Sequence, residues 1–174
     1  MADGTAATRA QPAMTSTRPD PVSPADDNAR AVAAGLLRLG HAALAWTDPD
    51  TGTPGISRIS FAKDPDFGLV TLISGLAPHF RALQTQPRCA LMLGEVGEKG
   101  DPLTHPRLMV RAEADFVAPD SPGRQDLRAR WLARAPKAAI YVDLPDFAFV
   151  RLVAHSALLN AGFARAYRLS PTDL

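Results

Sequence analysis

The sequence predicts a mainly β protein: a β-barrel of six to seven antiparallel strands with flanking helices. Three observations carry this prediction. Short apolar runs that alternate with polar residues recur along the chain, as expected for half-buried strands. Tight turns rich in proline, glycine and aspartate separate most of these runs. The helical segments lie between groups of strands and do not alternate with single strands, which argues against a doubly wound parallel sheet.

Length and composition indicate one domain with a tail. The chain has 174 residues, of which 46% are hydrophobic, enough to bury a core within a single domain. Residues 1–22 carry few large apolar side chains that would offset the entropy cost of ordering them. We therefore expect a disordered N-terminal tail over 1–22 and one folded domain over 23–174.

The charge balance and the single cysteine exclude several classes of protein. Nineteen basic and 18 acidic side chains give a net charge of +1, so no basic surface for nucleic acid is expected. Cys89 has no partner for an internal disulfide, which fits a reducing compartment. No apolar run is long enough to cross a membrane, and residues 1–21 lack a signal-peptide pattern. The prediction is a cytoplasmic protein with no membrane contact.

The first ordered element is expected to be a helix. Ser23 and Pro24 would supply a side-chain cap and a proline in the first turn. Asp26 and Asp27 place negative charge near the positive end of the helix dipole. An apolar stripe with helical spacing follows, and Gly40 predicts the end of the helix.

The sequence of the first half of the domain then predicts strands joined by turns. The expected elements are strands over 42–47, 56–63, 69–73 and 89–93, with a short helix over 78–85 before the last strand. Within the second strand, Ile59 and Phe61 share one face, and Arg58 and Ser60 share the other. This alternation predicts that one face is buried and the other is solvated.

The second half contains the longest strand pattern. Residues 107–117 alternate apolar and polar side chains over their whole length. Ser121 and Pro122 open a helix, and Pro136 opens a shorter one. Two strands over 147–154 and 156–160 follow, and a final segment ends near residue 169.

Several common catalytic motifs are absent from the sequence. There is no Gly-x-Gly-x-x-Gly after a strand, no phosphate-binding Gly-x-x-x-x-Gly-Lys loop and no Gly-x-Ser-x-Gly elbow. The four histidines are scattered singly, without the paired spacing of a zinc site, so we expect no metal site. The sequence identifies no catalytic acid, base or nucleophile.

Three short polar clusters remain as candidate binding sites. In the first, Arg58 and Ser60 lie on one strand face, where the guanidinium could hold a phosphate or simply be solvated. In the second, Ser74 follows a buried strand, and His79 and Arg81 lie at the start of a helix. Free backbone N–H groups there would attract an anion, although such residues are also ordinary helix caps.

The third cluster lies near the end of the chain, over residues 160–165. Gly162 indicates a positive φ or a close backbone approach, and Phe163 could pack on a planar ring. The alternative is an ordinary hairpin turn with a core aromatic residue.

Together, the order and spacing of these clusters resemble a known family. The chain resembles the pyridoxamine 5′-phosphate oxidase-like FMN-binding split barrels, specifically the haem-utilisation (HugZ-type) branch. The blocks that carry the resemblance are the strand 57–63, Ile73-Ser74-Gly75-Leu76-Ala77-Pro78-His79, Arg130-Trp131-Leu132-Ala133-Arg134-Ala135-Pro136-Lys137-Ala138-Ala139, Asp146-Phe147, Arg151-Leu152 and Gly162-Phe163-Ala164-Arg165-Ala166. They span roughly residues 25–170.

The resemblance implies a homodimer with FMN at the subunit interface and a small-molecule substrate. It also implies which residues hold the cofactor. The implied contacts are Arg58, Ile59, Ser60, Phe61 and Lys63 from the strand, Ser74, His79 and Arg81 from the second block, and Gly162 and Phe163 from the last. Lys63 enters by similarity to the Arg-x-x-x-x-Lys strand of the oxidase.

Three functions follow from this reading. The first is an FMN-dependent oxidoreductase, in which the flavin performs the redox chemistry. The second is a protein of haem-iron utilisation that binds FMN or haem without turnover. The third is a dimeric structural or regulatory protein with a vestigial pocket. Phe80 and Ala82, which replace polar residues common in the family, motivate the second and third.

Overall fold

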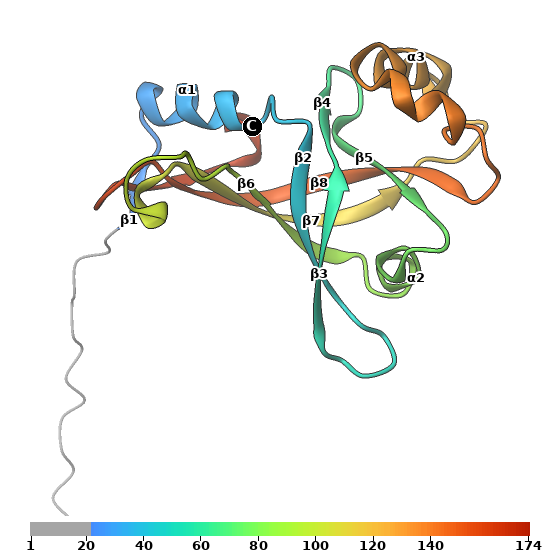
Figure 1. Ribbon diagram of the computed structural model, residues 1–174, viewed down its shortest axis with the longest axis horizontal. Helices are drawn as coiled ribbons and strands as arrows, with labels where there is room; N and C mark the ends of the chain where they lie inside the picture. Colours follow the sequence, from blue (N-terminus) through green and yellow to red (C-terminus); the bar gives the residue numbers. More distant parts are fainter. Residues whose placement is uncertain (1–21) are drawn as a thin grey trace, which may run out of the picture.

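The computed structural model describes residues 22–174. The expected disordered tail over 1–22 therefore lies outside the described residues, except for Val22. Three α-helices and nine strands form the described part of the chain (Figure 1). No helix within residues 22–174 has the length and apolar character needed to cross a membrane.

The nine strands form one sheet that curls around a core. The main order is β1-β9-β8-β7-β6-β2-β3, and β5 joins β8 to β4. The strands are β1 Val22–Pro24, β2 His41–Thr47, β3 Pro54–Ser60, β4 Ala62–Asp64, β5 Gly68–Ser74, β6 Arg88–Leu93, β7 Arg107–Phe116, β8 Phe147–Asn160 and β9 Ala166–Leu169. All pairs are antiparallel except β1 with β9. The predicted mainly β class with flanking helices is confirmed, and short β1, β4 and β9 raise the strand number above the expected six to seven.

The helices lie between groups of strands, as predicted. They are α1 Asp27–Leu36, α2 Pro78–Thr85 and α3 Arg124–Arg134, with short 3₁₀ turns at Pro102–Thr104, Pro136–Ile140 and Pro171–Asp173. In the view of Figure 1, α1 and α3 lie above opposite ends of the sheet, and the β2–β3 hairpin extends away from them.

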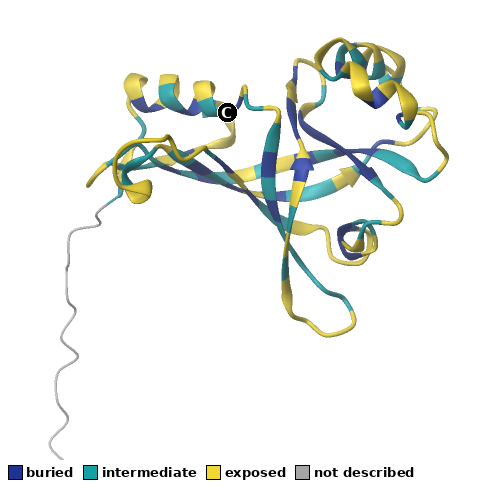
Figure 2. Cartoon of the chain, viewed as in Figure 1, coloured by how far each residue is buried: buried dark blue, intermediate teal, exposed yellow. Residues whose placement is uncertain are grey.

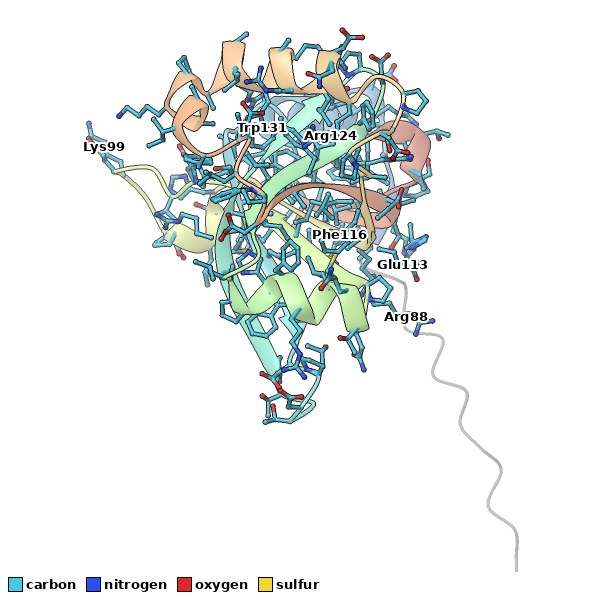
Figure 3. The ribbon with its side chains drawn as sticks, turned by 90° about the vertical axis from the view of Figure 1, so that its right-hand side faces the viewer. Arg88, Lys99, Glu113, Phe116, Arg124 and Trp131 are labelled. Carbon is cyan, nitrogen blue, oxygen red and sulfur yellow. The ribbon has the colours of Figure 1, made fainter. Side chains whose placement is uncertain are left out.

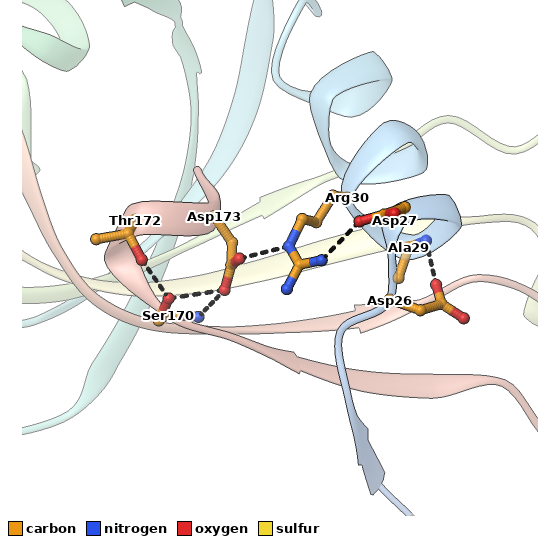
Figure 4. Close-up of polar contacts among 7 residues, drawn as sticks. All are labelled: Asp26, Asp27, Ala29, Arg30, Ser170, Thr172 and Asp173. Atoms are coloured by element: carbon orange, nitrogen blue, oxygen red, sulfur yellow. Dashed lines mark hydrogen bonds and ion pairs between the residues drawn. The ribbon is translucent and has the colours of Figure 1, made fainter.

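The prediction for the start of the first helix is wrong. Ser23 and Pro24 belong to β1, which pairs with β9 from the other end of the chain. Asp26 is the N-cap, and its carboxylate accepts a 2.7 Å hydrogen bond from the backbone N–H of Ala29 (Figure 4). The helix also ends at Leu36, before Gly40. Parallel pairing of β1 with β9 near the C-terminus holds Ser23 and Pro24 in a strand, so they do not start the helix.

Two strand boundaries differ from the prediction because of pairing. The expected strand 56–63 is divided at Phe61, whose backbone N–H donates to the carbonyl of Gly40 at 3.0 Å. The two strands expected over 147–154 and 156–160 form the single strand β8. His155 is an extra residue in β8, because the register with β7 shifts opposite Arg111 and Ala112. This is a β-bulge.

Two apolar clusters form the core (Figure 2). The larger lies between α1 and the sheet and includes Ile59 and Phe61, which are 4% and 1% exposed, as the alternation predicted. The smaller lies beneath α3, where Trp131 packs edge-on against Phe149 at 5.6 Å between ring centroids. Phe80 of α2 also joins the larger cluster.

The sheet formed by β3, β2, β6 and β7 has an outer face directed away from the larger core. Leu44 and Leu91 pair across β2 and β6 and are buried on the inner side. Their neighbours in sequence, such as Ala45 and Met92, therefore point outward. Met92 is 52% exposed and Ile56, on β3, is 76% exposed.

Candidate functional site

Arg58 and Ser60 lie together on the outer face of β3. Both are exposed, while Ile59 between them is buried. The register places Arg58 beside Ala43 of β2. Arg58 has no ion-pair partner among residues 22–174. This part of the predicted site is present as an accessible cation with a nearby hydroxyl.

Arg81 is held by a carboxylate. Its guanidinium donates two hydrogen bonds, of 2.7 and 2.8 Å, to Asp50 in the β2–β3 turn. The hydrogen bond from Arg81 to Asp50 raises the pKa of Arg81 above its usual value. The ion pair links α2 to the tip of the hairpin, so the Arg81 charge is already balanced.

Ser74 is also engaged. Its hydroxyl donates to the Asp146 carboxylate at 2.8 Å and accepts the backbone N–H of Leu76 at 3.1 Å. The carbonyl of Asp146 accepts the backbone N–H of Gly75. These contacts hold the turn after β5 against the segment before β8, and they place a carboxylate beside the predicted anion site.

His79 is buried within α2 and is 8% exposed. Its Nδ1 has no hydrogen-bond partner in the part of the chain that the structure describes. Burial lowers the pKa of His79, so the ring is neutral near pH 7. Leu83 of the same helix packs into the core that contains Ile59. Arg58 faces away from that core, and no hydrogen bond or ion pair joins it to His79 within residues 22–174.

The remaining predicted residues are more widely separated. The ammonium of Lys63 donates to the backbone carbonyl of Leu174 at 2.7 Å. Gly162 has a φ of 125° in the β8–β9 turn, which fits the positive φ that the sequence indicated. The ring of Phe163 is 86% exposed and is not a core residue. Among residues 22–174, no hydrogen bond or ion pair joins these three residues to Arg58, Ser74 or His79.

A cleft that the sequence did not indicate lies on the outer face of the sheet. It has a volume of about 450 Å³. Its floor contains Ala45 and Ala90, which pair directly across β2 and β6. We call it the alanine cleft. The other lining residues are Trp46, Thr47, Pro54, Arg88, Cys89, Arg111, Ala112, Glu113 and His155. The hollow exists because small side chains on adjacent strands lie between longer ones.

Charged groups line one side of the alanine cleft. Glu113 lies between Arg88, at 3.6 Å from Nε to Oε1, and His155, at 3.7 Å from Nε2 to Oε2. Figure 3 shows Arg88 and Glu113 at the same edge of the molecule. Burial, with a smaller effect of Glu113, raises the pKa of the Cys89 thiol to about 11, so the thiol is protonated at neutral pH.

The arrangement combines an apolar floor, two arginines and a histidine beside a carboxylate. Such a site can bind a largely apolar molecule that carries acidic groups. Sequence reasoning missed it because its residues come from five strands, β2, β3, β6, β7 and β8, that only tertiary pairing brings together. The sequence near His155 gave little sign of the cleft. His155 lies between two predicted strand segments, at the position that the structure shows to be a bulge. Within the described range, no group of three or more His, Cys, Asp or Glu side chains is placed to hold a metal ion.

No family model matches the chain. Two curated proteins are similar in sequence. The chloroplastic heme oxygenase HOZ of Arabidopsis thaliana is 30% identical over 116 residues, which are 67% of this chain and 34% of HOZ. The chain thus spans about a third of the length of HOZ. The heme oxygenase HutZ of Vibrio cholerae is 30% identical over 129 residues, which are 71% of this chain and 70% of HutZ.

Solved structures agree with the sequence comparison. The crystal structure of HutZ, described as a heme storage protein, matches with a TM-score of 0.61 and 28% identity, over 67% of this chain and 82% of that one. A putative pyridoxamine 5′-phosphate oxidase from Listeria innocua matches with a TM-score of 0.59 and 14% identity, over 78% of this chain and 100% of its own. The second likeness shows the fold alone.

Proposed function

Because the chain belongs to the pyridoxamine 5′-phosphate oxidase-like split-barrel family, in its haem-utilisation (HugZ-type) branch, we propose that it binds haem in haem-iron utilisation. The observation that carries this proposal is the similarity to HutZ, a heme oxygenase of which the chain covers 70%. The relatives point to haem-related or flavin-related chemistry, and the geometry of the chain favours haem.

Carboxylates beside the predicted phosphate site disfavour FMN within one chain. Arg81 is paired with Asp50, and Ser74 is hydrogen-bonded to Asp146. A flavin phosphate brought to these groups would have to displace one carboxylate and approach the other. The negative phosphate would repel the negative carboxylates of Asp50 and Asp146. Arg81 and Ser74 could donate to the phosphate only by giving up their present hydrogen bonds to these carboxylates.

We also propose that the protein acts as a homodimer through the outer face of the sheet. Ile56 and Met92 on this face are 76% and 52% exposed, although both are large and apolar. We propose that a second copy of the chain covers these side chains. In a two-fold dimer the same patch of each subunit contacts its partner, so one exposed apolar patch is enough to form the interface. The alanine cleft is continuous with this face, since Ala90 and Met92 are on the same side of β6.

FMN-dependent oxidoreductase activity is the second candidate. The observation that favours it is the exposed pair Arg58 and Ser60, whose cation has no ion-pair partner among the residues described. In a dimer, a phosphate could take its positive partner from Arg58 of one chain, and the flavin would supply the redox chemistry.

Visible absorption spectroscopy separates the two candidates. The full chain is titrated with ferric haem and, in a second experiment, with FMN. Haem binding is expected to shift and sharpen the intense haem band until one equivalent is bound, while FMN keeps its free spectrum and fluorescence. Quenched FMN fluorescence with an unchanged haem spectrum would support the flavin candidate instead.

A single variant makes this comparison sharper. Arg58→Ala is expected to leave haem binding unchanged, because Arg58 is not part of the alanine cleft. If FMN binds the wild-type protein and the variant loses it, the phosphate site lies at β3. A chain that binds neither ligand would overturn both candidates and would fit the third function, a vestigial pocket.

A further inference from the structure

A second hollow lies between the turn that follows α1 and the end of α3. It has a volume of about 470 Å³. Arg38 comes from the turn after α1, Arg134 ends α3, and Ser60 ends β3. We call this site the arginine hollow. It shares no lining residue with the alanine cleft, so the two sites are separate.

Buried aromatic residues and a backbone hydrogen bond hold the walls of the arginine hollow. Phe61 and Trp131 line it, and each belongs to one of the two apolar clusters of the core. Trp131 lies on the side of α3 that faces the sheet (Figure 3). The backbone N–H of Phe61 donates to the carbonyl of Gly40, which joins the turn after α1 to the break between β3 and β4. The walls are therefore formed before a ligand arrives, as in most small-molecule sites.

Arg134 is held in place by backbone carbonyls and not by a carboxylate. Its Nη2 donates to the carbonyls of Arg38 and Leu39, at 2.6 and 2.7 Å. These carbonyls follow α1, where a positive charge is favourable beside the end of the helix dipole. The Nε and Nη1 groups of Arg134 have no hydrogen-bond partner within residues 22–174. Arg134 can therefore donate to a ligand while it keeps its present bonds.

Arg38 and Ser60 supply further donors without partners. The Arg38 side chain is exposed and forms no hydrogen bond or ion pair in the part of the chain that the structure describes. The hydroxyl of Ser60 is also exposed and has no partner among the same residues. Guanidinium groups bind the oxygens of carboxylates and phosphates through charge-assisted hydrogen bonds. Two arginines and a hydroxyl around one hollow therefore suit an oxyanion.

No carboxylate neutralises these two arginines. Among the described residues that line the arginine hollow, none is acidic. Two smaller hollows adjoin it and also contain Arg134, and the one acidic residue that lines them is Asp64. Asp64 is already bound by Arg130 and by two backbone N–H groups. The charges of Arg38 and Arg134 are thus left to attract an anion.

We propose that the arginine hollow binds a small organic acid, whose carboxylate or phosphate group lies between Arg38 and Arg134 and accepts a hydrogen bond from Ser60. An oxyanion alone would fill only a small part of the volume, so the ligand also has an apolar body, which packs beside Phe61 and Trp131. The site goes beyond the proposed haem function, because an acid binds here without haem. Arg58, the cation of the flavin candidate, is not among its lining residues.

Calorimetry and tryptophan fluorescence of the full chain test this site. The probes are benzoate, phenyl phosphate and benzamide, the last being a neutral molecule of the same shape as benzoate. Either acid should give saturable heat, and the tighter of the two identifies the preferred group, while benzamide should not bind. Trp131 is one of two tryptophans in the chain. In Trp46→Phe, where Trp131 is the only indole, the same acid should change the emission.

Three variants locate the bound group. Arg38→Ala should weaken binding of the preferred acid by at least about tenfold. Arg134→Lys keeps a cation near the end of α1 but loses the planar fork of donors, and it should weaken binding about fivefold. Lys137→Ala is the matched control, since it removes an exposed cation that lies close in sequence to Arg134 but outside the hollow. It should bind the acid like the wild type.

The possible results separate this site from the haem function. Benzamide binding as tightly as benzoate, or the absence of heat with both acids, would overturn the arginine hollow. Wild-type affinity in Arg38→Ala, with unchanged Trp131 emission, would place the acid elsewhere and would overturn it too. None of these results alters a haem titration, and a chain that binds the acid but not haem would overturn the haem function alone.

Discussion

Asp64 of β4 and Arg130 of α3, whose side chain is 36% exposed, form an ion pair that joins the sheet to the helix. Two hydrogen bonds, of 2.7 and 2.9 Å, run from the guanidinium to the carboxylate, whose side chain is only 4% exposed. The same carboxylate accepts the backbone N–H groups of Asp66 and Phe67, each at 3.0 Å. One acidic group therefore organises the β4–β5 turn and positions α3.

Replacing Asp64 should destabilise the fold strongly. Asp64→Ala leaves the backbone N–H groups of Asp66 and Phe67 without their acceptor and leaves Arg130 with only its ion pair to Asp66, and such a loss costs about 2 kcal/mol. Urea denaturation would measure the loss. Asp143→Ala is the matched control, since it removes an acidic partner of Arg128 on the surface and should change stability little. Equal losses in both variants would contradict the structural role of Asp64.

Asp64 should also contribute to acid unfolding. Burial raises its pKa, but the hydrogen bonds from Arg130 and from the backbone of Asp66 and Phe67 lower it further, so it lies below the usual value. The stabilisation is fully present above the unfolded pKa of about 4 and is lost as the pH falls through the lower folded pKa. In Asp64→Asn, the melting temperature should depend less on pH below about 4 than in the wild type. An identical pH dependence would show that other groups control acid unfolding.

Gly55→Ala should be destabilising, because a methyl group there would collide with an indole ring. A Cβ at Gly55 would lie 2.4 Å from Cζ2 of Trp46, whose Nε1 donates to Ser57 at 3.1 Å. Displacing the ring should cost about 1–3 kcal/mol. Gly35→Ala, in α1 with no atom within 4 Å of the added group, should instead stabilise by about 0.5–1 kcal/mol. Thermal unfolding of the two variants compares their stabilities directly. A loss of stability in both variants would contradict the explanation that the collision with Trp46 destabilises Gly55→Ala.

Met92→Lys should weaken the proposed dimer. The side chain lies on the outer face of β6, and a two-fold interface would place the two new charges close together. Analytical ultracentrifugation of the wild type should give the dimer mass, and the variant should shift toward the monomer. Val96→Lys, which charges an exposed position in the loop after β6, should leave the mass unchanged. A dimeric Met92→Lys protein would show that the subunits associate through another surface.

Much of the fold could be predicted from local pattern. The alternation around Ile59 and the period of residues 107–117 identified strands and their buried faces, because burial on one side of a sheet imposes a repeat of two. The residues of the family motifs were also visible, since they are close in sequence. The hydrogen-bond partners of these residues could not be predicted. Arg81 and Ser74 donate to Asp50 and Asp146, which lie far from them along the chain.

By itself, the sequence determined the class of the fold, the order of its elements and the family to which the chain belongs. Hydrophobic spacing, turn residues and short motifs are properties of neighbouring residues. Tertiary structure alone decided that Ser23 pairs with β9, that Asp64 receives Arg130, and that His155 meets Glu113 beside a floor of two alanines. These relationships depend on strand register and packing between segments far apart in the chain, and no local pattern encodes them.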